Sequence, residues 1–198
     1  MKTLLAIVSC AKYAARVDAQ CATWVPLLLG AGYDVQVFDG PRLDVPDDYM
    51  SLPAKTKALC AWALANGYER MLKMDDDSYV RASKFSIVEQ HYAGIRIPAH
   101  DGWDHDYASG GAYWMSGLLM QAVAGARLDD WAEDRHVGQV AGRSGIPLFT
   151  LPAYVIADRQ HRWHHDEYHV KYDDAVVTQL NESVGVRACH ALKEGETL

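Results

Sequence analysis

Hydrophobic and polar residues follow one another along this chain in a way that predicts strands and helices in turn. Three short apolar runs have the length and composition of buried strands: residues 4–8, 33–38 and 71–74. Between them, apolar positions recur every three or four residues. This spacing predicts one helix after Ser9 and another that begins near Pro53 and ends at Gly67. The alternation is typical of an α/β protein with a mainly parallel sheet.

The helix after Ser9 is expected to be capped by the Ser9 hydroxyl and to bury one stripe of four residues: Ala14, Val17, Cys21 and Trp24. The second half of the chain carries weaker signals. In chain order they predict a short helix at 83–90, a strand at 95–97, a helix capped by Ser116, a helix opening in the acidic segment 129–134, and a strand-like run at 148–156 that Pro152 interrupts.

Length and charge limit the class of protein. A chain of 198 residues is the size of one domain and buries roughly 70% of the surface that it exposes when unfolded. The net charge of −7 disfavours binding to nucleic acid or an anionic membrane through overall charge. The four cysteines lack the spacing of a zinc site, which favours free thiols in a reducing compartment. The apolar run at 4–8 is too short to span a membrane.

The strongest chemical signal is the acidic triplet Asp75-Asp76-Asp77, which directly follows the third apolar run. Three adjacent carboxylates repel one another and are costly at the end of a strand unless a cation lies among them. The carboxyl ends of strands in an open α/β sheet are also where ligands bind. A solvated acidic turn explains the same residues without any ligand, so the triplet alone leaves both interpretations open.

Two glycine-containing segments carry a similar ambiguity. Asp39 and Gly40 end the second predicted strand, which favours a turn, although a nucleotide base or ribose is also held at such a place. Gly110 and Gly111 lie among aromatic residues, which indicates a backbone that a ligand or a neighbouring strand approaches closely.

Titratable residues gather in two later segments. Four acids lie between residues 129 and 134, and the dipole of a helix N-terminus accounts for only part of them. Five of the nine residues from His161 to His169 are histidine or arginine, which predicts a basic or metal-binding surface.

Taken together, these segments resemble the GT-A glycosyltransferases of the beta-1,3-galactosyltransferase and fringe family. Lys73 to Val80 resembles the family's Lys-x-Asp-Asp-Asp-x-Phe-Val signature. The other matching segments follow in the family's order: Val8-Ser9 with Arg16 and Trp24, Val37 to Gly40, Asp48-Tyr49 with Leu52 to Thr56, Tyr107 to Tyr113 with Ser116, and Glu133-Asp134 with Val137-Gly138. The order is more specific than any single motif.

The resemblance implies a GT-A (nucleotide-diphospho-sugar transferase) fold, with a Rossmann-like, mainly parallel central sheet flanked by helices. One catalytic domain would span residues 1–198. Its first half, about residues 1–80, would bind a nucleotide sugar, and its second half, about residues 107–198, would bind the acceptor and carry out catalysis. The implied enzyme is a metal-dependent, inverting hexosyltransferase that uses a UDP-sugar as donor.

The resemblance also implies a donor site. Asp77 would bind Mn²⁺ or Mg²⁺ directly, with Asp75 near the ribose or a metal-bound water and Asp76 beside it. A histidine would complete the metal site, and His161, His164 and His165 are the candidates, of which the first two suit the spacing of a strand exit. The remaining implied nucleotide contacts are Asp39, Lys55, Gly110 and Gly111, although an exposed helix lysine is the simpler interpretation of Lys55.

The implied general base is Asp134, which would take the proton of the acceptor hydroxyl, while Glu133 would orient the loop or the acceptor. Arg135 departs from the family's usual valine. A cation there is expected to lower the pKa of the base or to bind an anionic acceptor.

The acceptor stays open between a glycan, a glycolipid and a small molecule. The family's membrane anchor, stem and disulfides are not recognised, which favours the cytoplasm of a bacterial or phage-infected cell. A hydroxylated base of phage DNA is an alternative acceptor, motivated by local cations: Arg135, His136, Arg143, Arg159, Arg162 and Lys171. A nucleotide-sugar-binding protein without turnover and a metal-dependent phosphoesterase are further alternatives.

Overall fold

The computed structural model describes residues 1–99, 104–152, 154–156 and 176–179. At its centre lies a six-stranded sheet with the strand order β2-β1-β3-β6-β5-β7. The strands are β1 (Thr3–Val8), β2 (Asp34–Phe38), β3 (Arg70–Asp75), β5 (Tyr92–Ile97), β6 (Tyr107–Ser116) and β7 (Leu148–Thr150). Within this sheet only β6 runs against the other strands, because β1 is parallel to β2 and β3, and β7 is parallel to β5. The predicted mainly parallel sheet is confirmed.

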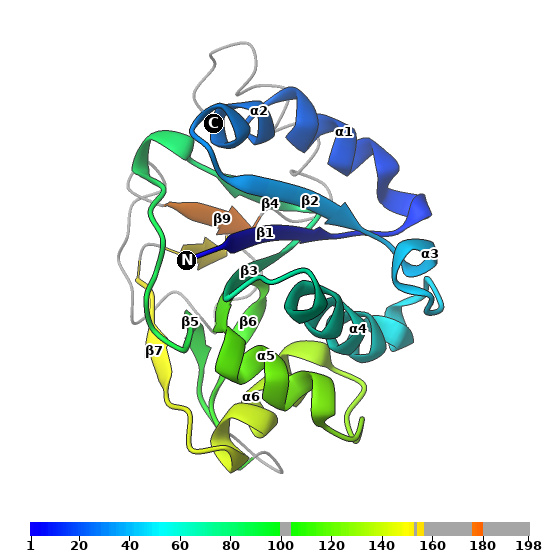
Figure 1. Cartoon of the computed structure of the whole chain (residues 1–198), viewed down its shortest axis with the longest axis vertical. Helices are drawn as coiled ribbons and strands as arrows, with labels where there is room; N and C mark the ends of the chain where they lie inside the picture. Colours follow the sequence, from blue (N-terminus) through cyan, green and yellow to red (C-terminus); the bar gives the residue numbers. More distant parts are fainter. Residues whose placement is uncertain (100–103, 153, 157–175, 180–198) are drawn as a thin grey trace.

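Helices cover both faces of the sheet (Figure 1). On one face lie α1 (Ala14–Ala22) and α2 (Val25–Gly30), and on the other lie α4 (Leu52–Ala65), α5 (Gly117–Gly125) and α6 (Glu133–Arg143). The short helix α3 (Gly40–Leu43) follows β2. A smaller sheet combines β4 (Ser78–Val80), β9 (Val177–Gln179) and β8 (Tyr154–Ile156). No helix in the described ranges has the length and apolar character needed to cross a membrane.

The alternation of side chains along β1 builds a core on each face of the sheet. Leu4 and Ala6 belong to the cluster that includes Leu59 of α4. Leu5 and Ile7 belong to the other cluster, on the face covered by α1 and α2. Successive side chains of a strand point to opposite faces, so one continuous apolar run supplies both cores.

The same alternation distributes the residues of β3. Met71 packs in the α4–α6 cluster, whereas Leu72 and Met74 pack in the α1–α2 cluster. Lys73 therefore faces the α4–α6 layer, although it is a charged residue in the middle of a central strand. Asp75, two residues further on, shares that face, and Asp76 points the opposite way.

The prediction for the first helix was partly wrong. Ser9 does not cap it, because the residues after Cys10 form a short 3₁₀ turn, and both Ala14 and Cys21 are exposed. The buried positions of α1 are Ala19 and Gln20. Gln20 is buried because its side-chain amide donates to the carbonyl oxygen of Ser78 (2.7 Å), just beyond the acidic triplet.

The helix predicted at 83–90 was also wrong, since only a 3₁₀ turn forms at Ala82–Lys84. The reason is tertiary. The buried guanidinium of Arg70 donates to the carbonyl oxygens of Val88, Glu89 and Gln90 at 2.6, 2.7 and 2.6 Å. These carbonyl oxygens accept hydrogen bonds from the Arg70 side chain rather than from backbone amides of a following helical turn.

The remaining predicted elements are confirmed. The Ser116 hydroxyl accepts from the amide of Leu119 at the start of α5. Helix α4 runs to Ala65, shortly before Gly67. The run at 148–156 forms β7 and β8, which Pro152 separates.

Candidate active site

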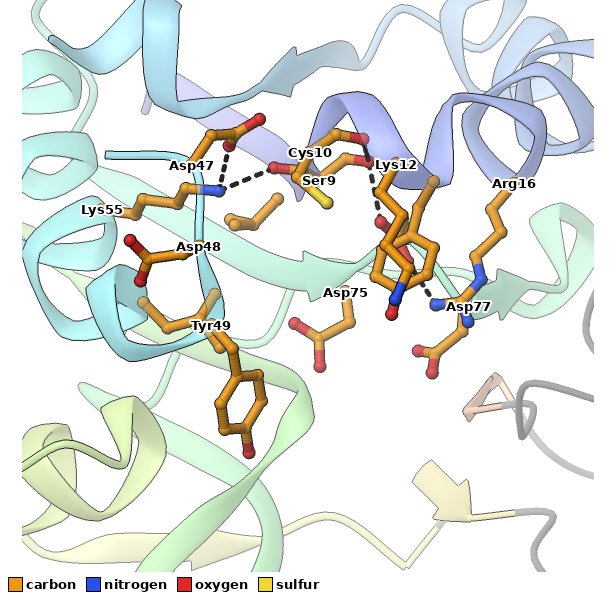
Figure 2. Close-up of a pocket in the computed structure, with 14 residues that line it drawn as sticks. Ser9, Cys10, Lys12, Arg16, Asp47, Asp48, Tyr49, Lys55, Asp75 and Asp77 are labelled. Atoms are coloured by element: carbon orange, nitrogen blue, oxygen red, sulfur yellow. Dashed lines mark hydrogen bonds and ion pairs between the residues drawn. The ribbon is translucent and has the colours of Figure 1, made fainter. Parts of the chain in front are cut away.

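A cavity of about 460 Å³ opens at the edge of the central sheet where β1 and β3 end. Parallel neighbours end at the same edge, and Val8 is paired with Asp75. Three segments line the cavity: the residues after β1, the loop and first turn leading into α4, and the acidic triplet (Figure 2). In the described part of the chain, the charged side chains around it are five aspartates and three basic residues.

Asp76 connects the acidic triplet to the end of β1 and to helix α1. Its two carboxylate oxygens accept from the Ser9 hydroxyl (2.7 Å) and from the Arg16 guanidinium (2.9 Å). Burial raises the pKa of Asp76, against the lowering effect of these two donors. Asp76 therefore joins the end of β1 and helix α1 to the end of β3.

Asp75 and Asp77 also line the cavity. Figure 2 shows their carboxylates directed toward the same open side, on which Tyr49 also lies. Two carboxylates on a cavity wall supply the oxygen donors that Mg²⁺ and Mn²⁺ bind. No group of three or more metal-binding side chains forms among the described residues. The predicted third donor would come from His161, His164 or His165, all of which lie outside the described ranges.

Lys55 is not an exposed helix lysine, so that interpretation was wrong. Its side chain is 2% exposed, and its ammonium donates to the carbonyl oxygen of Ser9 (3.0 Å) and to Asp47. Asp47 also accepts from the backbone amides of Gly40 (2.8 Å) and Ala11 (3.1 Å). Burial alone would raise the pKa of Asp47, but these donors together lower it. Lys55 is buried because this loop folds over it.

Behind the cavity, the fully buried Lys73 bridges two carboxylates. Its ammonium donates to Asp75 (2.6 Å), to Glu133 (2.6 Å) and to the carbonyl oxygen of Gly110 (2.8 Å). Burial alone would lower the pKa of Lys73, but the two carboxylates raise it above its ordinary value. Lys73 therefore carries a positive charge that holds a cavity residue and the first turn of α6 together.

Glu133 is buried beneath Asp134 at the start of α6. Besides the hydrogen bond from Lys73, the Glu133 carboxylate accepts hydrogen bonds from the hydroxyls of Tyr113 and Thr56, the latter at 3.4 Å. Burial raises the pKa of Glu133 to about 7, although the charge of Lys73 opposes the shift. The position of Glu133 inside the protein suits a residue that orients its neighbours.

Asp134 accepts two backbone hydrogen bonds, from Gly110 (3.1 Å) and from Arg135 (2.8 Å). Burial raises its pKa above the ordinary value for aspartate. The acidic pair of α6 closely approaches Gly110, because a Cβ there would lie 3.0 Å from a Glu133 oxygen and 3.4 Å from an Asp134 oxygen. The carbonyl oxygen of Gly111 accepts from the Ser78 hydroxyl (2.6 Å).

Helix α6 also touches β6 at a second glycine. A Cβ at Gly138 would lie 2.3 Å from the Cβ of Tyr107, closer than packed atoms approach. The helix is therefore seated directly on the strand backbone.

The side chain of Arg135 pairs with Asp130, and its backbone amide lowers the pKa of the proposed base Asp134, although burial raises that pKa by more. Its guanidinium makes two hydrogen bonds to Asp130 and lies 5.5 Å from the centre of the Trp131 ring. Arg143 is likewise bonded to Asp129 (2.9 Å). These ion pairs account for Asp129 and Asp130, two of the four acids of the 129–134 segment, and neutralise two of the cations that motivated DNA as an acceptor.

Asp39 accepts from the backbone amide of Arg42 (2.9 Å) as the N-cap of α3. Among the described residues, it is not one of those that line the cavity. The nucleoside contact implied for Asp39 stays a prediction.

Several cavity residues had no role in the sequence-based prediction: Cys10, Lys12, Tyr13 and Tyr49. The signal that identifies the first three is their position, because they follow the carboxyl end of β1 just as the triplet follows β3.

Comparison with known proteins identifies the fold. No protein-family model matches the chain, and no match is found among curated proteins. One matching solved structure is a glycosyltransferase involved in the glycosylation of the major capsid of PBCV-1. It is 12% identical, and the alignment covers 97% of this chain and 99% of that chain with a TM-score of 0.56. At this identity the likeness concerns architecture: the chain has a mixed α/β fold consistent with GT-A, shared over nearly its whole length with a glycosyltransferase.

Proposed function

We propose that this chain is an inverting glycosyltransferase that moves a hexose from a UDP-sugar to an acceptor hydroxyl, with Mn²⁺ or Mg²⁺ bound at the acidic triplet. One observation carries the proposal. Lys73 contacts both Asp75, on the cavity wall, and Glu133, beside the proposed base Asp134. This contact supports a site that brings the acids of β3 and α6 together, as transfer between two bound substrates requires, although Asp134 is not among the described residues that line the cavity.

The donor half of the proposal follows from the charges of the cavity. The cavity lining contains five aspartates and three basic side chains, so its excess of negative charge would repel a negatively charged diphosphate. A divalent cation held by Asp77 and Asp75, with a histidine of the 161–165 segment, would offset this repulsion and the charge of the departing nucleoside diphosphate. Lys12 and Arg16 lie on the same cavity wall and add positive charge near the phosphates.

The acceptor half depends on Asp134. A raised pKa makes an aspartate a better proton acceptor, and burial raises the pKa of Asp134. Its hydrogen bonds from Gly110 and Arg135 fix the direction of the carboxylate. Asp134 would accept the proton of the acceptor hydroxyl as its oxygen attacks the anomeric carbon from the side opposite the nucleotide. Glu133, held by Lys73, positions that carboxylate rather than contacting substrate.

Titration calorimetry with a panel of UDP-sugars, with and without Mn²⁺, tests the donor half. We expect binding that requires the metal and that weakens at least tenfold in Asp77→Asn, because the variant loses one charged oxygen donor. Asp44→Asn is the matched control, since Asp44 is an exposed acid outside the cavity lining. If no UDP-sugar binds in the presence of Mn²⁺, the proposal is wrong.

A further inference from the structure

Two exposed aromatic rings contact each other at the mouth of the site. Tyr49 exposes 69% and Trp131 51% of its surface, and their ring centroids lie 6.2 Å apart. Exposed aromatic residues are common as single residues, but two that meet from distant parts of the sequence form an apolar patch.

The patch lies between the two halves of the proposed site. Tyr49 lines the cavity, with its ring on the open side (Figure 2), and Trp131 comes just before Asp134 in the chain. Burial raises the pKa of the Tyr49 hydroxyl, and the charges of Asp134 and Asp75 raise it further. Tyr49 and Asp75 line the same cavity, and the ring of Tyr49 contacts Trp131, which lies three residues before Asp134.

Neighbouring residues order the backbone at Tyr49 and the ring of Trp131. Asp48 caps the 3₁₀ turn Tyr49–Ser51 by accepting from the Ser51 amide (2.9 Å). Asp130 holds Arg135, whose guanidinium lies over the Trp131 ring. A surface fixed before its ligand arrives loses little entropy on binding, which is what a binding site requires and a passive exposed patch does not.

We propose, building on the glycosyltransferase function above, that Tyr49 and Trp131 form the platform for the acceptor, and that the acceptor is a saccharide whose pyranose ring lies on Trp131 and touches Tyr49, whose ring is inclined by 47°. One face of a pyranose presents C–H groups, which suit the negative face of an aromatic ring. Its edge carries hydroxyls, and because Trp131 precedes Asp134 by three residues, a sugar on this ring would present such an edge on the side of the base. The platform thus orients one hydroxyl toward the base.

Charge favours a saccharide over a nucleic acid. Aromatic rings also stack with bases, but a single-stranded or flipped base brings phosphates with it. Near the platform these would meet Asp48 and Asp75 on the cavity wall and Asp134 on α6, and the Arg135 guanidinium over the Trp131 ring is already bonded to Asp130. A neutral sugar avoids this repulsion.

Saturation-transfer NMR with methyl glycosides of glucose, galactose and N-acetylglucosamine, in the presence of Mn²⁺ and UDP, tests the platform. We expect at least one glycoside to bind the wild type, with the dissociation constant raised about tenfold in Trp131→Ala and largely restored in Trp131→Phe. Phe149→Ala is the matched control, because Phe149 is an aromatic residue on β7 with 49% exposure that does not line the cavity. Thermal melting of each variant confirms that it is folded.

Calorimetric binding of UDP by the same samples separates the two proposals. If UDP binds but no glycoside does, or if Trp131→Ala binds the glycoside as tightly as the wild type, the platform is overturned and the donor site stands. If UDP itself does not bind the wild type, the proposed function fails. If sugar is transferred to duplex DNA that contains hydroxymethylcytosine and to none of the glycosides, the acceptor is a nucleic acid and the proposed saccharide acceptor is wrong.

Discussion

Lys73 of β3 and Glu133 of α6 form a buried ion pair, with Nζ and Oε1 2.6 Å apart and side chains that are 0% and 6% exposed. Because Lys73 also bonds Asp75, a single ammonium connects the cavity wall to the helix that carries Asp134. A lysine inside a central strand is unfavourable unless its charge is compensated. Here both carboxylates compensate it.

Removing one partner of this cluster should strongly destabilise the protein. We expect Lys73→Met to lower the free energy of unfolding at pH 8 by about 3–5 kcal/mol, because Glu133 is left buried without its cation. Urea denaturation measures the loss. The double variant Lys73→Met with Glu133→Gln should recover part of it, since no buried charge is then left uncompensated at Glu133. A double variant as unstable as the sum of both single variants would contradict the pairing.

The raised pKa of Glu133 predicts a pH dependence of stability. Its folded-state pKa of about 7 exceeds the ordinary value of 4.5, so the native protein holds this proton more tightly than the unfolded chain does. Stability from this group is thus greatest at low pH and is lost as the pH rises through 7. A pKa of about 7 instead of 4.5 corresponds to a free energy on the order of 3 kcal/mol.

Comparison with Glu133→Gln isolates this effect from the other acids. Between pH 5 and pH 8, the free energy of unfolding of the wild type should fall relative to that of the variant. Parallel curves for the two proteins would show that Glu133 titrates at the same pH in the folded and unfolded states.

The proposed base predicts a kinetic signature for Asp134→Asn. We expect the turnover number at saturating UDP-sugar to fall by about 10²–10⁴ while the affinity for UDP is retained, because the amide cannot accept the proton. Asp129→Asn is the control, since that exposed acid in the same segment is bonded to Arg143. Equal losses in both variants would indicate a general effect of acid removal.

Variants of Asp39 distinguish its role as the N-cap of α3 from the predicted contact with the nucleoside. Asp39→Ala should cost about 1 kcal/mol of unfolding free energy, because the amide of Arg42 loses its acceptor, whereas Asp39→Asn should cost little. Urea denaturation of both variants gives this difference. A decrease in UDP affinity in the same variants would place Asp39 at the nucleoside, and an equal destabilisation of both would exclude the cap.

Local pattern predicted most of the strands and helices, and its failures have tertiary causes. The apolar runs of β1 and β3 are strong signals because both faces of these strands are buried. The segment 83–90 has a helical pattern, but Arg70 bonds to its carbonyls from a distant strand. No local pattern contains that contact.

The site was predictable in position but not in detail. The strand-end rule leads directly to the acidic triplet, and the alternation of side chains explains why Asp75 and Asp76 face different layers. The burial of Lys55 was not predictable, because a loop from outside its helix produces it. The bridging position of Lys73 depends on where α6 packs, which only the three-dimensional structure defines.

At Gly138 the backbone of α6 packs directly against Tyr107 of β6, and this contact sets the distance between the helix and the sheet. A methyl group added there would have to push the helix outward by about 1 Å, and Asp134 would move with it. Displacements of that size can reduce a reaction rate about a hundredfold. The absence of a side chain at Gly138, which does not line the cavity, thus sets the position of Asp134 for the proposed proton transfer.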